Sequence, residues 1–293
     1  MYGVQLLILF SFDVTVSEQI MKLNSMVSLL KAWIRALVSF ICVMLLKLLS
    51  QQTTEQSKLR VLEHLRCLYG DKVEYGPFKG MRLGFRVWWS KFDVITKLLG
   101  VYEEHIVDQL RHFYSTSNVP FVDIGAADGY FAVGVAQLNW VEKVFAFEIS
   151  PIARSTLKEN AVRNNCAHKI DIGSEATLDK MAGIIETHPC AFVLVDIEGA
   201  EYELLNDKLL ELLKHCTIII ELHPRKIDDG WSKQTKLLED AAKFFKAEIL
   251  IRETYNPNMF KELSEFSDDD RLMAFSEGRK ANAQWLLLRP IAP

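Results

Sequence analysis

The sequence of 293 residues lacks any pair of cysteines at C-x-x-C spacing. Its cysteines are five in number and scattered along the chain: Cys42, Cys67, Cys166, Cys190 and Cys216. Structural zinc sites and redox motifs both need closely spaced cysteines, so the pattern indicates neither. Free thiols are typical of a reducing compartment, and we therefore expect a cytoplasmic protein.

The sequence also lacks an excess of positive charge. It has 34 Lys and Arg against 38 Asp and Glu, a formal net charge of −4. A nucleic-acid partner requires a basic surface that releases counterions from phosphates. We therefore expect no nucleic acid to bind.

A long uncharged hydrophobic run is missing as well. Residues 27–50 are rich in Leu, Val and Ile, but Lys31, Arg35 and Lys47 interrupt them, and the longest uncharged run, residues 36–46, has 11 residues. A membrane span needs about 20 apolar residues. The pattern favours a helix that docks on the rest of the chain or on a second subunit, or that lies in a membrane interface. Peripheral membrane contact and a homo-oligomer both stay open.

The patterning divides the chain into three parts. We expect a hydrophobic helical segment and linker over residues 1–57, with the polar linker at 51–57. An extension of helices and a small hairpin follows over residues 58–118. The main domain occupies residues 119–293, and within it we expect the acidic stretch 267–270 to be a solvated loop.

Short apolar runs alternate with helical patterns throughout the main domain. The seven runs expected to hold strands are 121–125, 144–149, 169–173, 190–199, 217–223, 247–253 and 284–290. The helical patterns between them cover 129–138, 151–164, 178–187, 201–213 and 233–245. This alternation predicts an α/β fold: a Rossmann-like, doubly wound, mostly parallel seven-stranded sheet with helices on both faces, plus the N-terminal helical extension.

The first expected strand ends in the turn D-x-G-x-x-x-G, formed by Asp123, Gly125 and Gly129. Ligands of such sheets bind beyond the carboxyl ends of the strands. The nicotinamide fingerprint would need Gly or Ala where Tyr130 stands, and no P-loop is present. A carboxylate here would repel a pyrophosphate but attract the ammonium and sulfonium of S-adenosylmethionine (SAM). The turn therefore favours SAM.

Glu148 ends the second expected strand, nineteen residues after Gly129. A carboxylate at this place accepts hydrogen bonds from both hydroxyls of a ribose. Asp123 or Glu148 alone would be an ordinary capping residue. At the ends of adjacent strands, together they favour a nucleoside cofactor.

Further acids follow the fourth and fifth expected strands. Asp196, Glu198 and Glu201 come after the fourth, and Glu221 and His223 end the fifth. One interpretation is helix capping by Glu198 or Glu201, since acids favour helix N-termini. The other is a polar pocket that faces the reacting group of the cofactor.

In the second interpretation His223 is the first choice for a general base, because its ordinary pKa of about 6.5 is near working pH. Glu198 is the second choice, and Asp196 orients the SAM amino group or the acceptor. A divalent cation in the same cluster is ranked below acid–base use, because the ligand order matches no specific metal pattern. No metal is therefore predicted.

Several segments resemble the FkbM-type SAM-dependent methyltransferases, a family of class I methyltransferases. They read FVDIGAADGYFA from residue 121, VFAFEISP from 144 and VDIEGAEYELL from 195; IELHP and the closing SEGR…QWLLLRP also suit the family. The resemblance covers residues 75–290, and its most specific part is D-[IV]-E-G-A-E at 196–201.

The resemblance implies a set of SAM contacts. The methionine part would meet Asp123, Gly125, Ala126 and Gly129, while Glu148 would bind the ribose. The remaining cofactor positions are Glu175 and Ala176 beside the adenine, Ala127 in the turn, and Asp196. Ala127 departs from the family, which commonly has Asn there.

The resemblance further implies an O-methyltransferase that acts on a small-molecule hydroxyl of a sugar, lipid or secondary metabolite. A nucleic-acid methyltransferase acting on amino groups would normally show an Asn/Asp-Pro-Pro-aromatic turn, which residues 196–199 do not have. A non-catalytic or membrane-associated Rossmann-like nucleoside-binding module is the alternative that stays open. Trp88 and Trp89, with Phe78 and Phe85, are candidates for a lid over the acceptor or for core packing.

Overall fold

The computed structural model describes residues 2–84, 93–252, 255–276 and 284–291, and divides the chain into two units, Met1–Gln56 and Ser57–Pro293. Helix α1 (Tyr2–Tyr69) makes up the first unit and continues into the second. Residues 51–57, expected as a polar linker, are part of this helix, and the boundary between the two units falls after Gln56. Neither proline nor glycine, the usual helix breakers, occurs between residues 4 and 69. Gly70, at φ 62°, ends the helix.

The hydrophobic part of α1 is longer than its uncharged core. Ser25–Leu46 is a stretch of 22 residues with a mean hydropathy of 2.1, enough by length and composition to cross a membrane. Lys31 and Arg35 lie inside it, and its residues are exposed. Membrane contact and a partner subunit at this stretch stay predictions.

The C-terminal end of α1 packs into a small hydrophobic core of the second unit. Its residues Val61, Leu62 and Leu65 share this core with α2 (Asp93–Leu98) and α10 (Asp268–Ala274). Residues 268–270 were expected in a solvated loop and instead form the first turn of α10, which corrects that prediction. The helix begins there because Ser267 Oγ accepts a hydrogen bond from the Asp270 N–H (3.2 Å) and because acids favour a helix N-terminus.

The rest of the extension is helix α3 (Glu104–Tyr114) and a turn region. The expected hairpin is reduced, in the described residues, to an antiparallel bridge between Lys72 and Arg82. Phe78 is buried in the main core and packs edge-on against Tyr130 (5.3 Å between ring centroids). Residues 85–92, with the two tryptophans considered for a lid, lie outside the described residues.

The main domain is built on a seven-stranded sheet in the order β3-β2-β1-β4-β5-β7-β6. The strands are β1 (Phe121–Ile124), β2 (Val144–Phe147), β3 (Ile170–Gly173), β4 (Phe192–Val195), β5 (Thr217–Leu222), β6 (Phe245–Ile251) and β7 (Gln284–Pro290). Strands β1 to β5 are mutually parallel, and β7 is antiparallel to both of its neighbours. The expected doubly wound, mostly parallel sheet is therefore confirmed.

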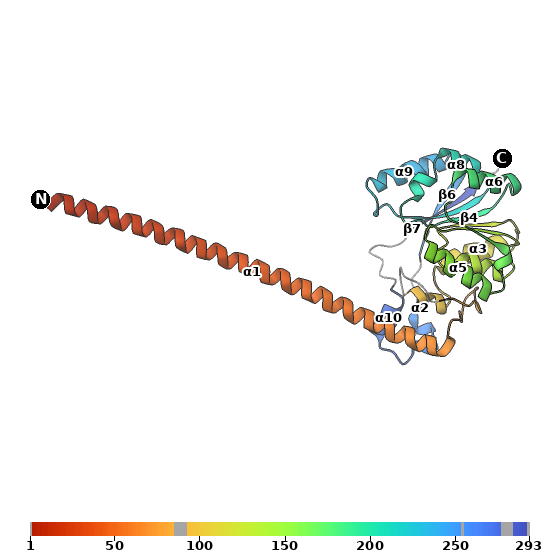
Figure 1. The fold of residues 1–293 in the computed structure, drawn as a ribbon, viewed down its shortest axis with the longest axis horizontal. Coiled ribbons are helices and arrows are strands. Elements are labelled where there is room, and N and C mark those ends of the chain that lie inside the picture. The colour runs from red at the N-terminus through yellow and green to blue at the C-terminus, as the bar shows by residue number, and fades with distance from the viewer. Residues whose placement is uncertain (1, 85–92, 253–254, 277–283, 292–293) are drawn as a thin grey trace. The chain divides into compact units, whose positions relative to one another are not determined.

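Helices cover both faces of this sheet (Figure 1). They are α4 (Tyr130–Gln137), α5 (Pro151–Arg163), α6 (Leu178–Thr187), α7 (Glu201–Leu204), α8 (Asp207–Leu212) and α9 (Gly230–Ala241), and the short 3-10 turns are Ala167–Lys169, Pro257–Met259 and Lys261–Leu263. Helices α3, α4 and α5 contribute to one large core, and α6, α8 and α9 to the other. The single helix expected over 201–213 is split, because Asn206 Oδ1 accepts hydrogen bonds from the N–H groups of Lys208 (3.1 Å) and Leu209 (3.3 Å) and so starts a new helix.

Strand order reverses at β1 and β4, which lie side by side although two other strands separate them in sequence. In open α/β sheets this is the place where ligands bind, beyond the carboxyl ends of the strands. Ile124 of β1 is level with Phe147 of β2 and Val195 of β4. The turns after these three strands are therefore brought to one edge of the sheet.

Candidate active site

The turn after β1 lies directly against the end of β4. Asp196 N–H donates to the Ile124 carbonyl (2.9 Å), and a Cβ atom added at Gly125 would lie 1.8 Å from the Asp196 carbonyl oxygen. Gly125 also has a φ of 91°, which side chains rarely allow. Glycine is required here because any side chain would push the two strand ends apart.

Ala127 lies in the same turn with a φ of 49°. This left-handed conformation is unfavourable for alanine and is tolerated better by asparagine. The Asn common at this position in FkbM-type proteins therefore suits the backbone. In this chain the turn is held instead by the Ala127 N–H, which donates to Glu148 Oε2 (3.0 Å).

A buried ion pair between Lys97 and Asp128 stabilises the turn after β1. Lys97 Nζ of α2 lies 2.7 Å from Asp128 Oδ2, and their side chains are 5% and 3% exposed. Asp128 Oδ1 also accepts from the Tyr130 N–H (3.3 Å), and its carbonyl accepts from the Asn160 side-chain amide of α5 (2.8 Å). Asp128 thus joins the turn to α2, α4 and α5.

Asp123 is buried beneath the turn, with 2% exposure. Burial raises the pKa of its carboxyl from 3.8 to about 7, and the nearby charges of Glu148 and Asp128 act in the same direction. Among the described residues its Oδ2 atom has no hydrogen-bond partner. A cation next to this carboxyl would favour the ionised form.

Glu148 lies at the end of β2 and bridges two loops. Its Oε2 accepts from the Ala127 N–H, and its Oε1 accepts from the Ser150 N–H (2.7 Å). A carboxylate has about four acceptor positions, so each oxygen can accept one more hydrogen bond from a ligand hydroxyl. Glu175 is exposed and Ala176 buried in the loop between β3 and α6. The predicted cofactor residues therefore lie at the end of β1 and on the loops after β1, β2 and β3, except for Asp196, which follows β4.

His223 follows β5, and its orientation is set by Glu201. The side chain of Glu201 is fully buried at 0% exposure, and Oε1 accepts from the His223 N–H (2.8 Å) and faces His223 Nδ1 (3.2 Å). Oε2 accepts from the Gly199 N–H (2.7 Å). Burial alone would raise the pKa of Glu201, but the hydrogen bonds from His223 and the backbone outweigh it and lower the pKa. An ionised Glu201 only accepts hydrogen bonds, so a hydrogen bond between the two side chains requires a proton on Nδ1 and leaves Nε2 facing away from Glu201.

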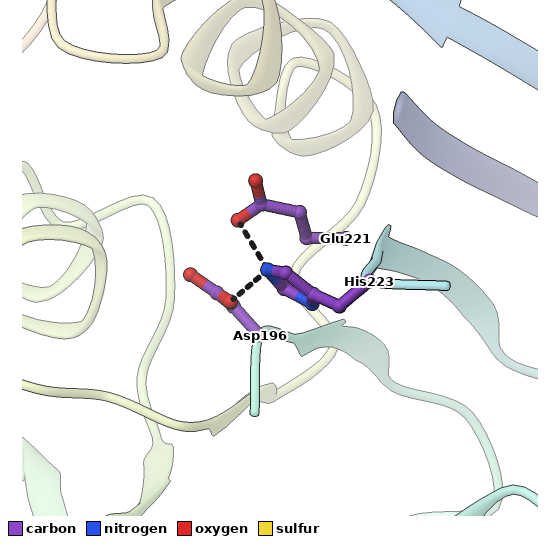
Figure 2. Close-up of side chains that lie close together, drawn as sticks. All are labelled: Asp196, Glu221 and His223. Atoms are coloured by element: carbon purple, nitrogen blue, oxygen red, sulfur yellow. Dashed lines mark ion pairs between the residues drawn. The ribbon is translucent and has the colours of Figure 1, made fainter. Parts of the chain in front are cut away.

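Three more carboxylates surround that second nitrogen. His223 Nε2 lies 3.3 Å from Glu198 Oε2, 3.7 Å from Glu221 Oε2 and 3.8 Å from Asp196 Oδ1. Figure 2 shows the carboxylates of Asp196 and Glu221 reaching the same ring nitrogen from different sides. Asp196 and His223 were predicted to meet at this edge, and they do.

The burial of these groups separates their roles. The side chains of Glu221 and His223 are 5% and 9% exposed, whereas that of Asp196 is 29% and that of Glu198 65% exposed. Glu198 also forms an ion pair with Lys226. The cluster is thus a mostly buried set of groups that opens to solvent beside Glu198 and Asp196.

Two members of the cluster were not among the predicted site residues. Glu201 was considered for helix capping, and it does accept a hydrogen bond from a backbone amide, but its other oxygen holds the imidazole. Glu221 was recognised at the sheet edge without a role. Strand alternation puts Glu221 and His223 on the same side of β5, and this signal in the sequence could have identified Glu221.

A cavity lies away from these groups. It has a volume of about 550 Å³ and is formed by α7, α8 and α9, with Tyr202, Asn206, Lys233 and Asp240 in its lining. None of the strand-end groups described above lines it. We place the candidate site by the chemistry of the strand ends rather than by cavity size.

Part of the chain is similar to a known protein family. Residues 174–268 match the family described as Methyltransferase FkbM domain. This segment contains D-I-E-G-A-E at 196–201, together with Glu221 and His223. No curated protein sequence matches the chain.

Three of the solved structures that are similar to this chain are as follows. The O-methyltransferase TomG from Streptomyces achromogenes, solved in complex with SAM, is 12% identical, with 64% of this chain and 81% of that chain covered and a TM-score of 0.45. Precorrin-6y C5,15-methyltransferase from Geobacter metallireducens is 15% identical, with 71% and 96% covered and a TM-score of 0.44. An rRNA methylase from Streptococcus thermophilus is 11% identical, with 64% and 96% covered and a TM-score of 0.41.

The similarity to this family consists of the domain match and the motifs inside it. The turn after β1 and the carboxylate at the end of β2 are compatible with SAM, the cofactor that this family uses. The buried Asp123 oxygen and the remaining acceptor positions of Glu148 fit an ammonium and a ribose. Over residues 174–268, the chain is therefore similar to the Methyltransferase FkbM domain.

Proposed function

We propose that the protein transfers the methyl group of SAM to a hydroxyl oxygen of a small molecule, such as a sugar, a lipid or a secondary metabolite. One observation carries the choice of a hydroxyl. His223 is fixed through Nδ1 by the buried Glu201, so that Nε2 faces the same strand ends as the predicted SAM turn. A neutral hydroxyl needs a base of this kind, because it must lose its proton as the new bond forms.

The reaction is a displacement in line with the sulfonium. The acceptor oxygen forms a bond to the methyl carbon while the S–CH₃ bond breaks and its electron pair stays on sulfur, which becomes a neutral thioether. The hydroxyl proton passes to the cluster around His223, whose Nε2 is the first acceptor and whose exposed member Glu198 is the second. Holding the two reactants in line supplies much of the remaining rate increase.

The cofactor contacts are proposed on the residues of the first three strand-end loops. Asp123 would neutralise the SAM ammonium, and Glu148 would accept from the ribose hydroxyls. The backbone of Gly125, Ala126, Ala127 and Gly129 would adjoin the methionine part. Glu175 and Ala176 would lie near the adenine, and Asp196 near the amino group or the acceptor.

We expect His223→Ala to lower methyl transfer to hydroxyl acceptors by about a hundredfold while SAM binding stays within about twofold of the parent. The measurement is the formation of S-adenosylhomocysteine by the full chain with a panel of sugars, lipid headgroups and phenols. SAM affinity is measured by calorimetry. His215→Ala serves as the control, because His215 is exposed in the turn before β5, at the opposite end of that strand from His223.

Parent activity with amines but not with hydroxyls would contradict O-methylation and leave the methyltransferase assignment intact. Full turnover by His223→Ala would remove His223 from the reaction. A folded parent that does not bind SAM would favour the alternative, a nucleoside-binding module without catalysis.

The pKa of Asp123 predicts how SAM binding depends on pH. Because this pKa is about 7 in the ligand-free chain, the carboxyl is mostly neutral at pH 6, and it must ionise to attract the ammonium. The SAM amino group itself begins to lose its proton near an ordinary value of about 7.7–8.0. We therefore expect the Kd for SAM to fall about fivefold from pH 6 to pH 7.5, measured by calorimetry.

Asp123→Asn is the matched variant for this pH dependence. It should bind SAM more weakly and show no tightening as the pH rises. Without SAM, the parent should become less stable as the pH rises. The Asp123 carboxyl holds its proton more tightly in the folded chain than in the unfolded chain, so the free energy of unfolding falls between about pH 4 and pH 7. Equal pH dependence in parent and variant would show that Asp123 does not meet the ammonium.

The remaining predictions concern partners and location. The absence of a nucleic-acid partner, the cytoplasmic location and a homo-oligomer stay predictions. Membrane contact through residues 27–50 also stays a prediction, and co-sedimentation of the full chain with lipid vesicles would test it.

A further inference from the structure

We propose that Asp196, Glu221 and His223 bind one divalent metal cation. This inference rests on the proposed function and refines it, because the cation would lie where the acceptor hydroxyl loses its proton. The three residues come from the ends of two neighbouring strands, β4 and β5, which pair in parallel with Val195 level with Ile220.

The ligand atoms are already close together. One oxygen of Asp196, one oxygen of Glu221 and Nε2 of His223 all lie within 4.8 Å of one another. Ligand atoms about 2.1 Å from a common ion would be separated by about 3.0–3.5 Å. The distances from Nε2 of 3.8 Å to Asp196 and 3.7 Å to Glu221 exceed this range by only a few tenths of an ångström. The candidate ligand atoms are separated by up to 4.8 Å, so side-chain rotation would have to bring the Asp196 and Glu221 oxygens together around the ion.

Glu201, which is not one of the three proposed ligands, orients the imidazole of His223. Metal-binding histidines usually donate their second N–H to a carboxylate, which fixes the ring and makes the ligating nitrogen more basic. The wholly buried Glu201 has this position on Nδ1, and it also accepts from the backbone N–H of the same histidine. The histidine is therefore anchored at two points, with Nε2 on the side of Asp196 and Glu221.

The charge around the ring also favours a cation. Four carboxylates lie within 4 Å of one imidazole, and two of them, Glu201 and Glu221, are almost fully buried. A divalent ion would balance more of this negative charge than a protonated histidine does. Lys226 contacts Glu198 at the exposed rim. The mixed oxygen and nitrogen ligands suit Mn²⁺ or Zn²⁺ better than Ca²⁺.

The position of the ion assigns separate roles to the acidic groups. The Asp196 carbonyl touches the glycine turn expected to hold SAM, so an ion at its side chain would be close to the reacting methyl group. An acceptor hydroxyl bound to a cation loses its proton more easily. With Nε2 occupied as a ligand, the proton would pass to Glu198, which is 65% exposed and 3.3 Å from that nitrogen. Glu198 thereby becomes the base and His223 a ligand.

The test is a titration of the metal-depleted full chain with Mn²⁺, in which electron paramagnetic resonance measures the free ion. The parent should show one saturable site per chain. Glu221→Gln preserves the side-chain shape and should weaken this site at least about tenfold, as should His223→Ala. Glu203→Gln is the control, because Glu203 is 82% exposed on the same segment and should leave the affinity unchanged. Circular dichroism confirms that each variant is folded.

The outcomes separate the two proposals. The metal site would be overturned if the parent had no saturable site, or if the parent and Glu221→Gln bound Mn²⁺ equally well. In that case, methyl transfer that a chelator does not affect would still support the proposed function. A site lost in both variants supports the inference. If that site is present but no hydroxyl is methylated with Mn²⁺ and SAM, the metal inference stands and the proposed function fails.

Discussion

Lys97→Met is expected to lower the free energy of unfolding by about 3–5 kcal/mol, because it leaves the Asp128 carboxylate buried without its cation. The two side chains are 5% and 3% exposed, with 2.7 Å between Lys97 Nζ and Asp128 Oδ2. The ammonium also lies 4.9 Å from the ring centroid of Tyr102 and 5.5 Å from that of Tyr130. Urea unfolding of the full chain followed by circular dichroism measures the change.

Two comparison variants sharpen this prediction. Lys79→Met removes a lysine that pairs with Glu74 at the surface (2.9 Å, side chains 58% and 26% exposed), and it should change stability by less than about 1 kcal/mol. Lys97→Met combined with Asp128→Asn should be more stable than Lys97→Met alone, since the second change removes the buried charge. A double variant less stable than the single one would contradict our account, because the loss would then come from packing around Asp128.

Local patterns in the sequence were sufficient to predict the sheet and several of the residues at its carboxyl edge. Continuous apolar runs such as Phe192–Val195 are typical of covered parallel strands. Once the strands are in place, residues that follow them must meet at the carboxyl edge. This is why Asp123, Glu148, Asp196 and His223 were located without a structure, although none of their contacts was.

Features that depend on distant contacts were not predictable in this way. The partner of Asp128 is Lys97, which lies 31 residues earlier on a helix of six residues. Glu201 looks like a capping residue in the sequence, and its contact with His223 spans 22 residues. Residues 268–270 were taken for a loop because a run of acids is usually solvated. In the fold the N-terminus of α10 accommodates the charges, and Arg60 of α1 pairs with Asp270 (2.7 Å).

Glu201→Ala should reduce stability by about 3–5 kcal/mol and also disturb the chemistry. Its carboxylate accepts from two backbone N–H groups, those of Gly199 and His223, and both would lose a buried acceptor. Glu198 and Gly199 have φ values of 59° and 115°, so this loop has an unfavourable backbone conformation that the two hydrogen bonds stabilise. Chemical denaturation measures the loss, with Glu203→Ala as the exposed control, expected within about 0.5 kcal/mol of the parent.

Glu201→Gln separates the structural role from the chemical one. The amide oxygen can still accept from His223, but the NH₂ group replaces Oε2 opposite the Gly199 N–H, where two donors would face each other. We expect a smaller loss of stability than in Glu201→Ala. Because the negative charge of Glu201 beside His223 Nδ1 is gone, Mn²⁺ affinity should still fall about 10- to 100-fold. Unchanged Mn²⁺ affinity in folded Glu201→Gln would mean that Glu201 supports the loop alone and that His223 does not depend on it for its orientation.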